Sequence, residues 1–351
     1  MKVSVLIDTY NHEKFIEQAV TSVLDQDMPM GDVEILVVDD GSTDRTPEIV
    51  RRFEPRVRLL RKPNGGQASA FNLGFSQLSG QIIALLDGDD WWEKEKLRLV
   101  LEAFQENSSI GVIGNGIHEA DAEGKILRTL SLDRPYKCFF RTLEEGIQFR
   151  SLMTYMGTSR LAIRRTTLER VLPVPEALVI EADEYLATLA VAVSGGLVLD
   201  QPLTNYRYHP GNLYQYGRFS LEKAARKSQV LECLMLELPG KLQKLGISSE
   251  IVREIVGGRG IEAERLRLTV DGGMPWETFC VEREAGRLAY KEFTLGYRIF
   301  RSLVLALTLL LPPKLFYRIQ NWYAERNLKR FRQLLGKPTL ADPLVQPKAE
   351  R

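Results

Sequence analysis

The sequence is poor in cysteine, has no long apolar run and carries almost no net charge, and each shortage excludes a class of protein. Its three cysteines lie far apart without a Cys-x-x-Cys pair, so neither a zinc site nor a disulfide framework is indicated, and a reducing compartment fits. No apolar stretch reaches the roughly 20 residues of a membrane-spanning helix. The first apolar run stops at Asp8, as in a strand and unlike a signal peptide. The net charge of +1 gives no overall field that would attract nucleic acid.

Two common nucleotide-binding loops are also absent. No Gly-x-Gly-x-x-Gly follows the first apolar run, and the chain has no Gly-Lys-Ser/Thr loop. The segment Asn64-Gly65-Gly66 opens a predicted helix, but it fits a turn as well as a phosphate cradle. A nucleotide site in this chain would therefore need a metal ion to meet the phosphate charge.

Two clusters of acidic residues are present, each directly after an apolar, strand-like run. The first is Asp39-Asp40, for which an ordinary turn remains an alternative interpretation. The second contains Asp87, Asp89 and Asp90, which would repel one another unless a cation lies among them. Carboxylate oxygens suit Mg²⁺ or Mn²⁺, and protein-bound Mg²⁺ usually keeps substrate phosphate among its ligands. The second cluster therefore predicts a divalent metal and a phosphate-bearing ligand.

Strands and helices alternate through the first hundred residues with short connections, and 44% of the residues are hydrophobic, enough for a sizeable core. This alternation predicts an α/β fold with a doubly wound, mostly parallel sheet. In such sheets ligands bind beyond the carboxyl ends of the strands, so Asp8 and both acidic clusters should come together. The predicted strands are 3–7, 33–38, 57–60 and 81–86, and the predicted helices are 13–25, 42–53, 67–78 and 93–106. Further strands are expected at 110–116, 161–164 and 197–200, with a helix at 183–193.

Four segments, in this order and spacing, resemble motifs of the family 2 glycosyltransferases, which are inverting enzymes with the GT-A fold. The segments are VSVLIDTYN (3–11), ILVVDDGSTD (35–44), NGGQASAFNLG (64–74) and LLDGDDWW (85–92). The resemblance covers roughly the first 210 residues. It implies transfer of a sugar from a nucleoside-diphosphate sugar to a hydroxyl of a glycan or a lipid-linked acceptor, with a divalent metal as cofactor.

The resemblance also implies roles for individual residues. Asp87-x-Asp89 is similar to the family's Asp-x-Asp motif, which binds ribose and the metal–diphosphate. Phe71 stands where the family often has an Arg, which would leave one cation fewer on the phosphates, and Asp8 stands where a small or polar residue is commoner. The residues expected to bind the nucleotide sugar are Thr9, Tyr10, Asn11, Asp39, Asp40, Asn64, Gln67, Asn72, Asp87 and Arg207. The residues expected to bind the metal are Asp87, Asp89, Asp90 and His209.

The acceptor half of the resemblance lies in ADEYL (182–186) and PLTNYRYH (202–209). The acceptor hydroxyl must lose a proton as it attacks, and a carboxylate can take it. Ala182 replaces the acid usual in the family, so Asp183 and Glu184 are both candidates for this base. An acid at this position could instead be an ordinary residue of a helix N-terminus, where the helix dipole stabilises a negative charge. His209 could alternatively contact the diphosphate or simply form hydrogen bonds, and Trp91-Trp92 could stack on a sugar or pack in the core.

The carboxyl-terminal segment 292–335 has the pattern of a membrane-surface element. Its apolar run, 303–311, is too short to span a bilayer. The residues after it form a basic amphipathic pattern with Trp322 and Tyr323. Positions 312 to 337 contain seven Lys or Arg residues and one Glu. Such a helix suits an anionic membrane surface, whereas packing on the catalytic domain or in a homodimer is the alternative.

We therefore expect a GT-A catalytic domain in residues 1–215, with a nucleotide-binding half (1–110) and an acceptor half (111–215). A helical extension (216–335) and a disordered tail (336–351) would follow. The expected location is cytoplasmic, on the inner face of the plasma membrane. No Gln-x-x-Arg-Trp motif of a processive synthase occurs. The rival hypotheses are a sugar-nucleotide nucleotidyltransferase, which would want a Gly-rich basic loop after the first strand, and a catalytically inactive glycan-binding scaffold.

Overall fold

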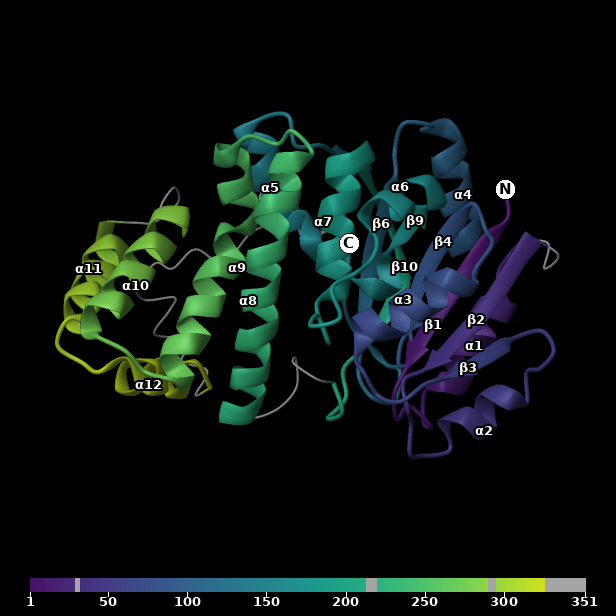
Figure 1. Ribbon diagram of the computed structural model, residues 1–351, viewed down its shortest axis with the longest axis horizontal. Coiled ribbons are helices and arrows are strands. Elements are labelled where there is room, and N and C mark those ends of the chain that lie inside the picture. The colour runs from purple at the N-terminus through teal and green to yellow at the C-terminus, as the bar shows by residue number, and fades with distance from the viewer. Residues whose placement is uncertain (29–31, 213–219, 290–294, 326–351) are drawn as a thin grey trace, which may run out of the picture.

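The computed structural model describes residues 1–28, 32–212, 220–289 and 295–325. Figure 1 shows a twisted sheet with helices on both faces and a further group of helices at one end. The predicted α/β fold, with a mostly parallel central sheet and a carboxyl-terminal helical extension, is confirmed. The predicted domain boundaries stay predictions, and the tail 336–351 lies outside the described residues.

One sheet contains all ten strands of the described residues. They are β1 (Val3–Thr9), β2 (Val33–Asp39), β3 (Arg58–Arg61), β4 (Ile82–Asp87), β5 (Trp91–Trp92), β6 (Val112–Ala120), β7 (Ile126–Leu130), β8 (Tyr136–Cys138), β9 (Ala162–Arg164) and β10 (Gly196–Arg207). The order is β3-β2-β1-β4-β9-β6-β10-β5, with β7 beside β6 and β8 beside β10. Strands β3, β2, β1 and β4 are parallel, as are β6 and β10, and β9 runs antiparallel between β4 and β6.

The register of β1 decides which side chains meet at the edge of the sheet. Its parallel pairing places Thr9 opposite Asp39 on β2 and Asp8 opposite Asp87 on β4. Because all three strands end at this edge, the acidic residues that lie far apart in the sequence come together there.

Helices cover both faces of the sheet. They are α1 (Ile16–Leu24), α2 (Thr46–Arg51), α3 (Gln67–Gln77), α4 (Lys96–Glu106), α5 (Leu143–Leu152), α6 (Arg165–Val171) and α7 (Ala182–Ser194). Successive side chains of a strand point to opposite faces. Val5 and Ile7 accordingly pack in one core cluster with α1, α2 and α4, whereas Leu6 packs in the other with α3 and α7. Burial on both faces explains why the central strands are continuous apolar runs.

Helix α2 begins later than the sequence predicts. The segment Ser42–Asp44 was expected to cap a helix, but the first helical residue is Thr46. The reason is that the Ser42 hydroxyl and the Asp44 carboxylate accept hydrogen bonds from the backbone amides of Asn11 (2.9 Å) and Glu13 (3.0 Å). These side chains therefore join two loops at the sheet edge.

Other elements also differ from their predicted bounds: the helix expected at 13–25 is Ile16–Leu24, and the strand expected at 110–116 is Val112–Ala120. The helix expected at 93–106 begins at Lys96, because Trp91 and Trp92 pair with β10 as a short strand. The strand expected at 197–200 continues to Arg207 through a register shift at Pro202. The longer β10 brings the segment before His209 to the same edge of the sheet as Asp89.

The helical extension consists of α8 (Leu221–Lys244), α9 (Ser249–Val270), α10 (Pro275–Ala289), α11 (Leu295–Thr308) and α12 (Pro313–Glu325). Helix α8 packs against α7, and α9 packs against α5, α10 and α12. Buried side chains of α8 and α9, among them Leu231 and Ile255, join the same core cluster as Leu6. Figure 1 shows α10, α11 and α12 farthest from the sheet. Across the described residues, every helix is too short or too polar to cross a membrane.

Leu6→Ala should destabilise the fold by about 2–5 kcal/mol, because Leu6 is fully buried on the central strand and its removal leaves a cavity. Leu127→Ala on β7 is the matched control, since Leu127 is 56% exposed, and it should change stability by no more than about 0.5 kcal/mol. Urea denaturation of both variants measures the difference. Equal losses would contradict the assignment of Leu6 to the core.

Candidate functional site

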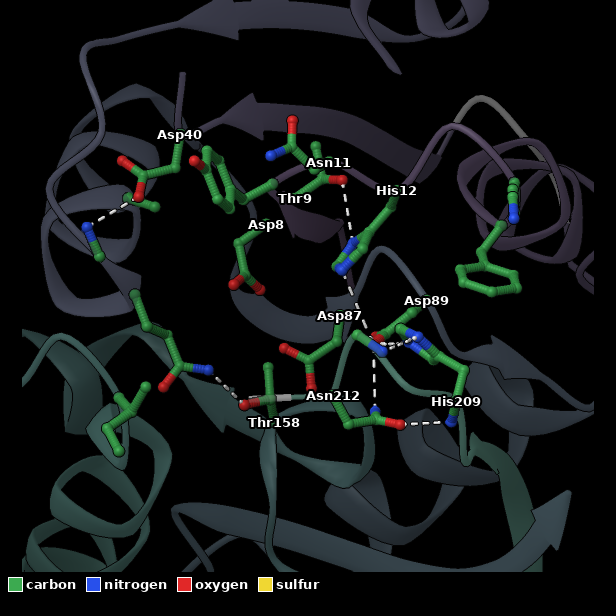
Figure 2. Close-up of a pocket in the computed structure, with 18 of the residues that line it drawn as sticks. Asp8, Thr9, Asn11, His12, Asp40, Asp87, Asp89, Thr158, His209 and Asn212 are labelled. Atoms are coloured by element: carbon green, nitrogen blue, oxygen red, sulfur yellow. Dashed lines mark hydrogen bonds and ion pairs between the residues drawn. The ribbon is translucent and has the colours of Figure 1, made fainter. Parts of the chain in front are cut away.

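A cavity of about 930 Å³ opens at the carboxyl ends of β1, β2 and β4. Figure 2 shows side chains of the acidic edge pointing into it, facing residues that precede β9 and follow β10. The predicted site residues that line it are Thr9, Tyr10, Asn11, Asp40, Asn64, Gln67, Asp87, Asp89, Asp183 and His209. Those that lie elsewhere among the described residues are Asp39, Asn72, Asp90, Glu184 and Arg207.

Hydrogen bonds join the segments that follow β1 and β2 beside the cavity. The amide of His12 donates to Thr46 Oγ1 (2.9 Å), and the amide of Thr43 donates to Asn11 Oδ1 (2.8 Å). Asn11 adopts a left-handed conformation with φ of 57°, which Asn tolerates better than most residues. This arrangement leaves Tyr10 at the cavity as a residue that is 42% exposed.

Asp40 organises the loop that follows β3. Its carboxylate accepts hydrogen bonds from the amides of Gly65 (3.0 Å) and Gly66 (2.7 Å) and pairs with Lys62 Nζ at 2.6 Å. Its backbone oxygen accepts from Asn64 Nδ2 at 3.0 Å. The glycine amides are thus engaged by a carboxylate, so the geometry favours the turn interpretation of Asn64-Gly65-Gly66 over a phosphate cradle.

Two predicted nucleotide-binding residues have internal partners. Asp39 is fully buried, where its carboxylate accepts from the Ser42 amide (2.9 Å) and pairs with Arg61 Nε (2.8 Å). The Asn72 side chain donates to the Val174 carbonyl (2.8 Å) and accepts from its amide (3.0 Å). Both residues therefore support the walls of the cavity, and their predicted contacts with a nucleotide stay predictions.

Asp8 and Asp87 form the centre of the acidic edge. Burial, followed by the charge of Asp89, raises the pKa of Asp8 to about 8. Burial, followed by the charge of Asp8, raises the pKa of Asp87 well above its usual range. Asp8 Oδ1 is buried and lacks a hydrogen-bond partner among the described residues. Carboxylate oxygens in this state fit Mg²⁺ or Mn²⁺, because a divalent cation would relieve the repulsion and occupy the orphaned oxygen.

Asp89 lies beside two imidazoles. The distance from its Oδ2 to His209 Nε2 is 2.9 Å, and the distance to His12 Nε2 is 3.7 Å. Burial alone would raise the pKa of Asp89, but the two imidazoles lower it overall. The potential ligand atoms of His12, Asp89 and His209 lie within 4.8 Å of one another, as do those of Asp87, Asp89 and Asp90. Either group could hold a metal ion.

His12 is a site residue that the sequence analysis missed. The available signal was its position just after the first strand motif, in a chain with only three histidines. Two of these three lie within 4 Å of one carboxylate oxygen, although 197 positions separate them in the sequence. Only the fold shows this convergence.

Asp90 and Arg207 lie behind the cavity. Asp90 accepts from Ser159 Oγ (2.6 Å) and from the Arg207 amide (2.9 Å), and burial followed by the charge of Asp89 raises its pKa to about 7. The Arg207 guanidinium lies 4.4 Å from the ring centroid of Trp91 and donates to the Asp89 carbonyl at 2.9 Å. Both residues therefore hold the Asp87–Asp90 turn in place.

Ser159 and its neighbours complete this support. The carbonyl of Ser159 accepts hydrogen bonds from Trp92 Nε1 and from the buried Lys96 Nζ, both at 2.7 Å. Burial is the main cause that lowers the pKa of Lys96 well below its usual range. Trp92 is thus a core residue, and of the two interpretations of Trp91-Trp92 the structure favours core packing.

The two candidate bases at the start of α7, Asp183 and Glu184, have different surroundings. Asp183 lines the cavity, and its Oδ2 accepts from the amide (2.9 Å) and the hydroxyl (3.2 Å) of Thr158. Glu184 is buried and instead accepts from Arg259 Nε of α9 at 2.7 Å. Glu181, with φ of 58°, also faces Arg259, at 3.4 Å. The extension therefore neutralises the acids on either side of Asp183 and leaves Asp183 facing the cavity.

Comparison with known proteins identifies the family. Residues 4–171 match the model for glycosyl transferase family 2. The chain is 31% identical over 234 residues to an uncharacterized glycosyltransferase of Nostoc, an alignment that spans 65% of this chain and 71% of the relative. It is 34% identical over 131 residues to the poly(ribitol-phosphate) beta-N-acetylglucosaminyltransferase TarS of Staphylococcus aureus, an alignment that spans 34% of this chain and only 23% of TarS.

A solved structure shows the same fold. The structure of S. aureus TarS residues 1–349 in complex with UDP-GlcNAc matches with a TM-score of 0.53 at 20% identity, over 82% of this chain and 88% of that one. The matching architecture is a mostly parallel sheet between helices, followed by carboxyl-terminal helices. The chain therefore belongs to glycosyl transferase family 2 and is a glycosyltransferase with the GT-A fold.

Proposed function

We propose that this glycosyltransferase is metal-dependent and inverting, and that it moves a sugar from a nucleoside-diphosphate sugar to a hydroxyl of a glycan or lipid-linked acceptor. The observation that supports this most is the arrangement of one cavity. Asp8, Asp87 and Asp89 gather at one side of it, while Asp183 faces it from the start of α7. A substrate in this cavity could therefore contact both a metal ion held by the acidic edge and a base, Asp183. Membership of the family counts against the nucleotidyltransferase and the inactive scaffold.

The charge of the cavity supports metal dependence. Nine Asp or Glu residues line it against three Lys or Arg. A nucleoside diphosphate is itself anionic, so it would be repelled unless a cation lay between the two. Either Asp87, Asp89 and Asp90, or Asp89 with His12 and His209, could hold Mg²⁺ or Mn²⁺. When bound, the metal would act as a Lewis acid toward the departing diphosphate.

The surroundings of Asp183 support its role as the base. In a single displacement the acceptor oxygen attacks the anomeric carbon on the face opposite the leaving group, so the configuration inverts. Asp183 can take the hydroxyl proton because it faces the cavity, whereas Glu184 is already paired with Arg259. The hydrogen bonds from Thr158 would orient the Asp183 carboxylate for this transfer.

We further propose that the extension attaches the enzyme to the inner face of the plasma membrane. Helices α11 and α12 pack inward through Val304, Phe316 and Tyr317. Lys314 and Arg318 are exposed, and an anionic surface would attract them. The exposed apolar side chains of the two helices and of the turn between them, here called the apolar face, are Ile299, Leu303, Leu307, Leu309, Leu310, Leu315 and Ile319. A homodimer would cover the same face, and residues 292–294 and 326–335 of the predicted segment lie outside the described residues.

Asp89→Ala should abolish metal binding and sugar transfer while the protein stays folded, because Asp89 is the carboxylate shared by both candidate ligand groups. UDP-GlcNAc, which is bound in the TarS structure, is the first donor to test. Mn²⁺ binding by electron paramagnetic resonance and donor turnover are the measurements. Asp27→Ala, at an exposed surface ion pair, is the control. Near-normal turnover of Asp89→Ala, or full activity in excess EDTA, would refute metal dependence.

Asp183→Asn should lower turnover by about 10²–10⁴-fold while nucleotide binding persists, because the variant loses the general base. Glu184→Gln should have a smaller effect on turnover and should chiefly lower stability, since it weakens the bond to Arg259. Steady-state kinetics and nucleotide binding to both variants separate these effects. If Glu184→Gln loses more turnover than Asp183→Asn at equal stability, Glu184 is the base.

Leu303→Glu/Leu310→Glu should release the protein from anionic liposomes without lowering transfer to a soluble acceptor. Both leucines are at least 66% exposed on the apolar face, and charge there opposes insertion. Leu236→Glu is the control, because Leu236 is 83% exposed on α8 outside that face. Sedimentation with phosphatidylserine vesicles at low and high salt measures binding. If the unmodified protein never sediments, and the double variant instead turns a dimer into a monomer, the face is a subunit contact.

A further inference from the structure

Arg160 lines the cavity and has no anionic partner among the described residues, unlike Lys62 and Arg259, which do not line it. It ends the short helix Thr158–Arg160 and lines the cavity beside Thr158 and Tyr206. Lys62 pairs with Asp40, and Arg259 pairs with Glu184. In the part of the chain that the structure describes, the guanidinium of Arg160 forms no ion pair, and its Nε is buried without a hydrogen-bond partner.

The position of this guanidinium is nevertheless fixed. Its Cζ lies 5.6 Å from the ring centroid of Tyr206, a contact with the face of an aromatic ring that holds a planar cation. The side chain also folds across Gly157, where an added Cβ would lie only 1.8 Å from Nη2. Asp90, whose charge acts on Arg160, already accepts from Ser159 and from the Arg207 amide. Arg160 is therefore held in place by packing.

A buried, unpaired N–H donor is unfavourable, and such groups in native proteins usually have a functional reason. A phosphate oxygen would supply the missing acceptor, because Arg binds phosphate through charge-assisted hydrogen bonds. Helix α3 offers no cation for this purpose, and Phe71 on that helix is apolar and fully buried. Arg160 therefore offers a positive charge, held in place by packing, in a cavity that is lined mainly by acidic residues.

We propose that Arg160 binds an oxygen of the phosphate that carries the sugar in the donor's diphosphate, an inference that rests on the proposed function. In the reaction the acceptor oxygen forms a bond to the anomeric carbon, and the bond from that carbon to the diphosphate oxygen breaks. The electron pair of the broken bond leaves with the nucleoside diphosphate, and the hydroxyl proton passes to Asp183. Arg160 offsets the negative charge that develops on the leaving oxygen, which is how fixed donors in a desolvated site accelerate such steps.

The test compares a nucleoside diphosphate with the matching monophosphate, using UDP and UMP in the presence of Mn²⁺. Arg160→Ala should weaken UDP binding by about tenfold while UMP binding stays within about twofold, because UMP lacks the phosphate that Arg160 contacts. Arg160→Lys should recover part of the affinity. Arg170→Ala is the matched control, since Arg170 is an exposed arginine of α6 that does not line the cavity, and it should leave both affinities unchanged. Isothermal titration calorimetry measures the affinity of the unmodified protein and of each variant for UDP and for UMP.

Each outcome has a separate meaning. Unchanged UDP binding in Arg160→Ala, or equal losses for UDP and UMP, overturns the inference but leaves the proposed function standing. If donor binding is unchanged and KM rises only for a phosphate-bearing acceptor, the phosphate that Arg160 binds belongs to the acceptor, which also overturns the inference. If the unmodified protein binds neither UDP nor any other nucleoside diphosphate with metal, the proposed function itself fails. Should Arg160→Ala misfold by circular dichroism, Arg160→Met, which preserves more of the packing on Tyr206, replaces it in the same comparison.

Discussion

The parallel pairing of β1 with β2 and β4 is the constraint on which the rest of the site depends. It places Asp8 beside Asp87 and Thr9 beside Asp39, so several carboxylates meet where the strands end. This arrangement makes ionisation of the carboxyl groups unfavourable, because burial and the charges of neighbouring carboxylates raise the pKa values of Asp8 and Asp87. A divalent cation at this edge would relieve the repulsion and at the same time attract an anionic donor.

The acidic residues around the cavity fall into two groups, those paired with a cation and those without a cationic partner among the described residues. Asp39, Asp40 and Glu184 each have a cationic partner, on β3, in the loop after it or on α9. Asp8 and Asp183 have none among the described residues, and both line the cavity. The helical extension takes part in this division, because Arg259 of α9 neutralises the acids next to Asp183. The extension therefore helps to shape the cavity, which Arg226 of α8 also lines, and it is the proposed membrane contact as well.

The sequence predicted the architecture because β1, β2 and β4 are single apolar runs and the helices between them have clear periodicity. It predicted the acidic edge because acids follow those runs directly. It could not predict which acids are paired, since Asp39 and Asp40 are chemically alike and their partners lie on or after another strand. The pairing of Glu184 with Arg259 spans 75 positions, and the convergence of His12 on Asp89 depends on the end of one strand and the turn after another. Such contacts come from packing, which local patterns do not encode.

The most direct test of the account is the melting temperature of the unmodified protein with Mn²⁺ alone, with UDP alone and with both together. Ligands that bind only the folded state raise its stability by mass action. The account predicts that UDP has little effect in EDTA, that Mn²⁺ has a modest effect, and that the two together raise the melting temperature by more than the sum. If no nucleoside diphosphate stabilises the protein with metal, or if UDP stabilises it equally in EDTA, the acidic edge is not a metal–diphosphate site.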